Sequence, residues 1–119
     1  MQQSMKRSSL LSLLTVLLFI AGALMVPVGA TEMPAPLGVL LEQTCYDCHD
    51  DALARGDLEL NALPFTLDDH DLRERWVYIY DRIQKEEMPP DPTDLTTEER
   101  QAFLQLLGDA ILAADRADV

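Results

Sequence analysis

Hydrophobic residues in this chain form one dense, nearly continuous run near the amino terminus and, further on, stripes separated by polar positions. The run covers residues 10–25, follows the basic pair Lys6 and Arg7, and precedes a proline and small residues. This order is typical of a secretory signal peptide. We therefore expect residues 1–30 to be a signal that is cut after Ala30.

An uncleaved membrane anchor is the alternative interpretation of this segment. Its apolar run of 16 residues approaches the roughly 17–25 residues of a spanning helix. In both cases the remainder is exported: the cleaved protein would be periplasmic or secreted, and the uncleaved one anchored to the membrane and facing the periplasm.

The chain after the signal begins with a linker and a first helix. Residues 31–36 contain two prolines, which favour an extended linker. A single domain is expected over residues 37–119. Its first helix has an apolar face that runs straight into Cys45, and a loop over residues 50–67 follows. The face consists of Leu37, Leu40, Leu41 and Thr44.

Two further amphipathic helices complete the pattern. One begins at Thr66 or Asp69 and ends near Glu86, and a stiff turn with three prolines follows it. The last helix has a capping box, with Thr96 as N-cap and Glu99 three positions later. The middle stripe is Leu72, Trp76, Ile79, Tyr80 and Ile83, and the last is Phe103, Leu106, Leu107, Ala110, Ile111 and Ala114. No strand-like alternation is present, so the sequence predicts an all-α domain.

Charge narrows the range of partners. The whole chain has a formal charge of -12, and without residues 1–30 it keeps all 21 acidic residues and seven of its nine basic ones, which gives -14. Nucleic-acid binding requires a basic stripe and is therefore excluded. Anionic membrane surfaces are disfavoured for the same reason. Lys85 is then the one remaining lysine, so we expect a protein partner with a basic docking surface.

Candidate chemistry lies in one short motif. Cys45, Cys48 and His49 form C-x-x-C-H, the pattern of covalent c-type haem attachment. Cysteines three apart on a helix that is just ending face the same side and reach the two vinyl groups of one porphyrin. The adjacent histidine then points toward the iron. The motif uses both cysteines of the chain, which strengthens the prediction of one covalently bound haem c.

Three other uses of these residues are weaker. A thioredoxin-like redox pair requires a preceding strand and a βαβ setting. A zinc site would join Cys45, Cys48, His49 and His70, but adjacent ligands fit poorly in one tetrahedron. A disulfide across two intervening residues closes a very short loop and adds little stability.

The second axial position of the iron has three candidates, and coordination that stays open is the simplest alternative. Met88 follows an amphipathic helix and precedes two prolines, so its thioether is well placed to point inward. Met33 lies in the linker, too close to Cys45 to reach the far face of the porphyrin. His70 stands among acidic residues, which indicates a surface position.

Supporting residues each have two interpretations. Trp76 packs against the porphyrin and offers its indole N–H to a haem propionate, serves as an aromatic core anchor, or does both. Arg55 and Arg82 pair either with propionates or, as we favour, with ordinary carboxylates.

Four blocks of the chain resemble the planctomycete-type cytochrome c domain. The blocks are 41–49, 56–60, 76–83 and 87–90, and the resemblance covers about Leu37 to Ala114. It implies a small class I cytochrome c fold, with three to four helices around one covalently bound haem and crossing terminal helices. It also implies thioether bonds at Cys45 and Cys48, a proximal ligand at His49 and a distal ligand at Met88.

These observations favour an exported mono-haem electron carrier with His/Met ligation over an enzyme, because no distal acid/base constellation is visible. A catalytic or gas-sensing haem protein with a displaceable distal ligand is the first alternative. A membrane-anchored subunit that delivers electrons to a larger oxidoreductase is the second.

Overall fold

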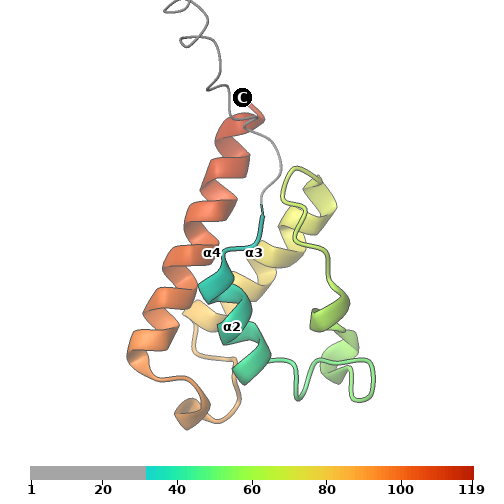
Figure 1. Cartoon of the computed structure of the whole chain (residues 1–119), viewed down its shortest axis with the longest axis vertical. Helices are drawn as coiled ribbons and strands as arrows, with labels where there is room; N and C mark the ends of the chain where they lie inside the picture. Colours follow the sequence, from blue (N-terminus) through green and yellow to red (C-terminus); the bar gives the residue numbers. More distant parts are fainter. Residues whose placement is uncertain (1–31) are drawn as a thin grey trace, which may run out of the picture.

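The structure, a computed structural model, describes residues 32–119. Over these residues it contains the α-helices α2 (Ala35–Thr44), α3 (His70–Gln84) and α4 (Thr97–Ala117) and no strand (Figure 1). Short 3₁₀ turns join them: η1 (Arg55–Asp57), η2 (Leu60–Ala62) and η3 (Pro92–Asp94). The prediction of a small all-α domain is confirmed.

The proposed signal, residues 1–30, lies outside the described residues, so neither the cut after Ala30 nor the anchor is addressed by the fold. Within residues 32–119, no helix has the length and apolar character needed to cross a membrane.

Helix α2 begins slightly earlier than the prolines suggested. It starts at Ala35 and includes Pro36 in its first turn, where the missing proline N–H would have no partner within the helix anyway. Leu37 and Leu41 are completely buried, whereas Leu40 and Thr44 are half-buried. The expected face is therefore correct, with its centre on the two buried leucines.

Helix α3 begins at the second of its two expected starts. Asp69 is the N-cap, and its side chain accepts a hydrogen bond of 3.0 Å from the backbone N–H of Leu72. The helix ends at Gln84, two residues before the expected Glu86, which has a positive φ of 58°. Trp76, Ile79 and Ile83 of the stripe are buried.

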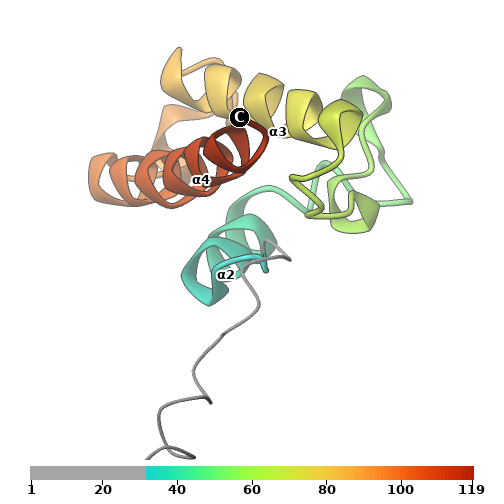
Figure 2. The ribbon, with the colours of Figure 1, turned by 90° about the horizontal axis from the view of Figure 1, so that it is seen from above.

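Helix α4 packs against both α2 and α3. Its capping box is present as predicted, between Thr96 and Glu99. Seen from above, α4 and the segment 45–69 lie on opposite sides of the domain, with α3 reaching across between them (Figure 2). The packing of α2 on α4 agrees with the contact of terminal helices that the resemblance implies. The buried stripe of α4 is Phe103, Leu107, Ile111 and Ala114.

A glycine allows a close approach between α3 and α4. A Cβ atom at Gly108 would lie only 3.2 Å from Cε2 of Tyr80, tighter than ordinary van der Waals contact. The small residue in α4 thus makes room for the ring of Tyr80.

One buried charge joins α3 to the end of α4, and the apolar pattern gave no sign of it. Arg73 is 8% exposed and donates a hydrogen bond of 2.7 Å to the carbonyl of Leu67. Its guanidinium also pairs with Asp115, at 3.0 Å from Nε to Oδ1, and with Asp118. A buried guanidinium is tolerated because each bond partly offsets its desolvation.

Replacing Arg73 by Leu is expected to lower the free energy of unfolding by about 2 kcal/mol. The Leu67 carbonyl loses its donor and the two carboxylates lose their counter-charge. The acids are half exposed, which keeps the effect below that of a fully buried pair. Chemical denaturation of the intact protein measures it. Arg116→Leu, at an exposed position of the same helix end, is the matched control, and equal stability of the two variants would contradict this role.

Candidate functional site

The C-x-x-C-H motif forms a single helical turn that continues α2. The N–H groups of Cys45 and Tyr46 both donate to the carbonyl of Leu41, at 2.9 and 3.2 Å, and the N–H of His49 donates to the carbonyl of Cys45 at 3.1 Å. Cys45, Cys48 and His49 are all half-buried. The two thiols are thus carried on a helix that is just ending, as predicted.

The following loop returns to the main chain of the motif. The carbonyl of Cys48 accepts a hydrogen bond of 3.1 Å from the backbone N–H of Arg55. The carbonyl of His49 accepts one of 2.7 Å from the backbone N–H of Leu60. Gly56 has a φ of 68° and open space around its Cα, so the backbone conformation, rather than the space available, favours glycine there. The loop therefore has a defined path beside the motif.

A cavity of about 720 Å³ lies between the motif, this loop, α3 and the turn after α3. Its volume falls within the roughly 300–1,000 Å³ of ligand sites. The lining combines the two thiols and the imidazole with aliphatic side chains and one thioether. These residues are Cys45, Cys48, His49, Leu58, Leu60, Ile79, Ile83 and Met88.

Met88 is thus the methionine that the fold brings to the motif. It is half-buried in the turn after α3, its N–H donates to the carbonyl of Arg82 at 3.3 Å, and its peptide bond to Pro89 is cis. Met33 also packs against the core but does not line the cavity.

The turn continues into η3, which Asp91 caps. The Asp91 carboxylate accepts hydrogen bonds from the N–H and the hydroxyl of Thr93, at 2.9 and 2.7 Å. These bonds hold the pKa of Asp91 below its usual value. The turn that carries Met88 is therefore ordered on its far side as well.

His49 has an unsatisfied nitrogen. Its Nδ1 atom is buried and has no hydrogen-bond partner among the described residues. Leaving a buried polar atom unpaired costs about 1–3 kcal/mol. A buried imidazole with an unpaired nitrogen lines the same cavity as two thiols and a thioether. Together these side chains can hold a bound iron group.

The Cys45 thiol lacks the lowered pKa of a redox-active cysteine. Both cysteines are free. Burial, and secondly the neighbouring Cys48, raise the pKa of the Cys45 thiol to about 11. Thiols that exchange disulfides have a lowered pKa, so the Cys45 thiol does not fit the thioredoxin-like alternative.

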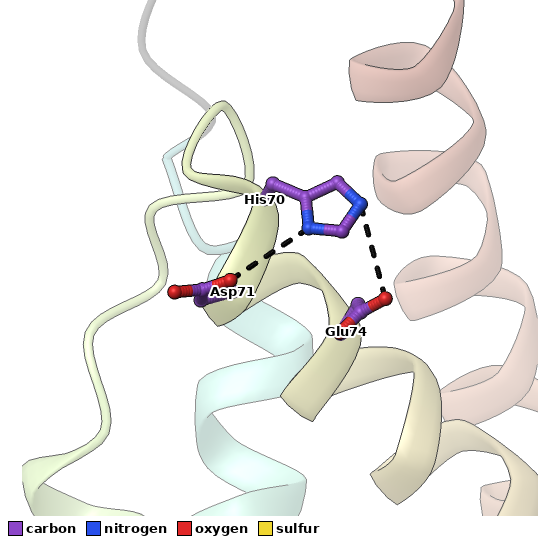
Figure 3. Close-up of side chains that lie close together, drawn as sticks. All are labelled: His70, Asp71 and Glu74. Atoms are coloured by element: carbon purple, nitrogen blue, oxygen red, sulfur yellow. Dashed lines mark ion pairs between the residues drawn. The ribbon is translucent and has the colours of Figure 1, made fainter.

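The zinc alternative fails on geometry. His70 is 71% exposed at the start of α3 and does not line the cavity. Its ring lies between Asp71 and Glu74, with one N–O separation of 3.8 Å to each (Figure 3). These three exposed side chains bring one ligand atom each within 4.8 Å of the others, but the cysteines are not part of the group. The surface position predicted for His70 is confirmed.

Trp76 occupies the second of its two expected roles. It is completely buried, its indole N–H donates to the carbonyl of Pro64 at 2.9 Å, and its ring packs edge-on against Phe65 at 5.0 Å between centroids. Trp76 does not line the cavity. Because the indole N–H already has a main-chain acceptor, it is not free to bind a propionate.

Three arginines line the cavity: Arg55, Arg75 and Arg82. Arg82 donates to Glu87 at 2.6 Å and also bonds the Tyr78 hydroxyl, so the ordinary salt bridge favoured for it is present. Arg75 was missed by the sequence reasoning. It lies seven residues before Arg82 on the same helix, and this spacing alone places both on one face.

Part of the chain matches a known protein family. The family model of Planctomycete cytochrome C matches residues 45–92. This stretch is a planctomycete-type cytochrome c domain. No match was found among the curated proteins or the solved structures.

The cytochrome c domain so identified contains the motif, the loop, all of α3 and Met88. A domain of this family indicates a c-type cytochrome that carries electrons and contains haem c with its iron. The cavity described above agrees with that cofactor, because it offers aliphatic walls, two thiols, an imidazole and a thioether; three arginines and four acidic side chains also line it.

Replacing Trp76 by Phe tests its role in the cytochrome c domain. The hydrogen bond to Pro64 is lost while an aromatic ring stays beside Phe65, so the free energy of unfolding is expected to fall by about 1–2 kcal/mol. The midpoint potential of the haem-loaded protein is expected to stay unchanged. Denaturation and potentiometry measure the two effects. A shifted potential with unchanged stability would instead indicate a contact with the cofactor.

Proposed function

We propose that the protein is an exported mono-haem c-type cytochrome that carries single electrons, with His49 and Met88 as the axial ligands of its iron. The observation that supports this most is the single cavity lined by Cys45, Cys48, His49 and Met88. The first three lie on one turn, and Met88 lies on a separate segment after α3. The two iron ligands, His49 and Met88, would therefore come from different parts of the fold.

The cysteines attach the cofactor. Cys45 and Cys48 would each hold the haem through a thioether bond, made by addition of the S–H group across a vinyl C=C bond with no net gain or loss of electrons. The helical turn from Cys45 to His49 fixes the spacing of both sulfurs relative to the imidazole. His49 then acts as the proximal ligand.

Met88 completes the coordination from the turn after α3. When bound, the haem would supply one-electron chemistry, with His49 and Met88 holding its iron and the thioether of Met88 raising its potential. The leucines and isoleucines of the cavity exclude water from the porphyrin. Arg55 and Arg75 supply positive charge at the wall of the cavity, where it suits the two propionates.

Spectra of the purified protein test this function. Expression with a cytochrome c maturation system is expected to give a red protein whose haem stays bound after denaturation. The oxidised form should show the weak long-wavelength band of thioether ligation, and Met88→Ala should remove it. Cys45→Ala combined with Cys48→Ala should give a colourless and largely unfolded chain, because the cofactor fills the centre of a small domain.

Other outcomes would overturn parts of the proposal. A colourless product with and without the maturation system would refute haem attachment. Tight carbon monoxide binding by the unmodified reduced protein would favour the catalytic or gas-sensing alternative, since the distal ligand would then be displaceable. A mature chain that still begins before Thr31 would favour the anchored delivery subunit.

The partner is expected to have a basic docking surface. The described residues contain 21 acidic and seven basic side chains. Asp57 and Asp94 are exposed acids at the cavity wall for which the described residues give no side-chain hydrogen bond or ion pair. Acidic groups near the cofactor attract a cationic partner to the place where the electron leaves.

Electron transfer to the cation hexaammineruthenium(III) is expected to slow as ionic strength rises, whereas transfer to ferricyanide should accelerate. Replacing Asp57 and Asp94 by Asn should reduce the rate with the cation about twofold or more, since charge at the cavity wall steers the encounter. The paired control is Glu98→Gln with Asp109→Asn on α4, which changes net charge equally. Stopped-flow rates that do not change with ionic strength would contradict this mode of docking.

A further inference from the structure

Arg100, in the first turns of α4, joins three segments of the domain. Its Nη1 atom donates a hydrogen bond of 2.7 Å to the carbonyl of Ile83, in the last turn of α3, and one of 2.9 Å to the carbonyl of Met88. The start of α4 is thereby connected to the end of α3 and to the turn that carries the thioether.

The partners of Arg100 are main-chain carbonyls and not carboxylates. Acidic side chains outnumber basic ones threefold after residue 31, yet the described residues give Arg100 no carboxylate within salt-bridge distance. Its half-buried guanidinium instead binds two main-chain carbonyls. A cation also suits the carboxyl end of α3, where unpaired carbonyls carry partial negative charge.

The position of Arg100 is itself fixed. The capping box closes the start of α4 between Thr96 and Glu99, and the N–H of Arg100 donates to the carbonyl of Thr96 at 2.9 Å. The guanidinium is therefore extended from an ordered helix start, not from a frayed end.

Both main-chain polar groups of Met88 are consequently held. Its N–H binds the carbonyl of Arg82, and its carbonyl binds Arg100. The next two residues are prolines, whose φ angles are restricted. The main chain of Met88 is thus held, and its remaining conformational freedom is in the side-chain torsions.

We propose that Arg100 is a positioning residue that holds the thioether of Met88 in place as the distal ligand, an inference that rests on the function proposed above. Arg100 acts through the main chain of Met88 and does not line the cavity. Without its two hydrogen bonds, the turn gains freedom and the thioether competes less well with an external ligand for the iron.

Cyanide binding to the oxidised, haem-loaded protein measures this competition. Arg100→Gln, which is too short to reach both carbonyls, is expected to raise the apparent affinity for cyanide about tenfold, which corresponds to about 1.4 kcal/mol. The thioether band should weaken in the same variant. Arg100→Lys keeps the charge but not the guanidinium, and a smaller increase of about threefold is expected, equivalent to roughly 0.7 kcal/mol.

Arg73→Leu is the matched control, because it removes another arginine that binds α3 and α4 but none of its partners adjoins Met88. It should lower stability and leave cyanide affinity unchanged. If Arg100→Gln does not accumulate as haem-loaded protein, Arg100→Lys decides the question. Cyanide affinity and thioether band equal to those of the unmodified protein would overturn the positioning role. An unmodified protein that lacks the thioether band would overturn the Met88 ligand itself, and the two failures are thus distinguishable.

Discussion

The packing of α4 against both α2 and α3 is the constraint on which the site depends. The motif lies at the end of α2, and Met88 lies beyond the end of α3. These two segments are 39 residues apart and have no local reason to meet. Phe103, Leu107 and Ile111 bury one face of α4 in the shared core, and Arg100 and Arg73 add polar connections to α3 and to the segments beside it. The relative placement of thiols, imidazole and thioether is therefore a property of the helix packing.

The elements that the sequence predicted well are those whose signals are local. The capping box at Thr96 and Glu99 needs only four residues, and the stripes that contain Leu37, Trp76 and Phe103 need only helical periodicity. The C-x-x-C-H turn is similarly local, since the hydrogen bonds that form the turn itself join residues at most five apart. Met88 was expected to point inward because it lies between an amphipathic helix and two prolines, which is again a feature of the nearby chain, and it lines the cavity.

What the sequence could not provide are the partners supplied by distant segments. Arg73 binds Asp115 and Asp118 across the domain, so its burial has no counterpart in the pattern of α3 itself. The two interpretations of Trp76 were separated only by the carbonyl of Pro64, which lies twelve residues away. Pro36 shows where a local rule was applied too broadly. Proline disfavours the interior of a helix, but Pro36 lies in the first turn of α2, where its missing N–H has no partner to lose.

The distribution of the seven cations after residue 31 also bears on function. Arg73 and Arg100 are engaged by main-chain carbonyls at the helix junctions, and Arg82 is paired with Glu87 beside the cavity. Arg55 and Arg75 lie at the cavity wall, where two propionates would neutralise them. Only Lys85 and Arg116 then remain as positive charges without such a role. Because Arg73 and Arg82 pair with only three of the 21 carboxylates, most of the acidic side chains have no arginine or lysine partner among the described residues. The proposal of a basic partner therefore rests on the carboxylates that the arginine contacts leave unpaired.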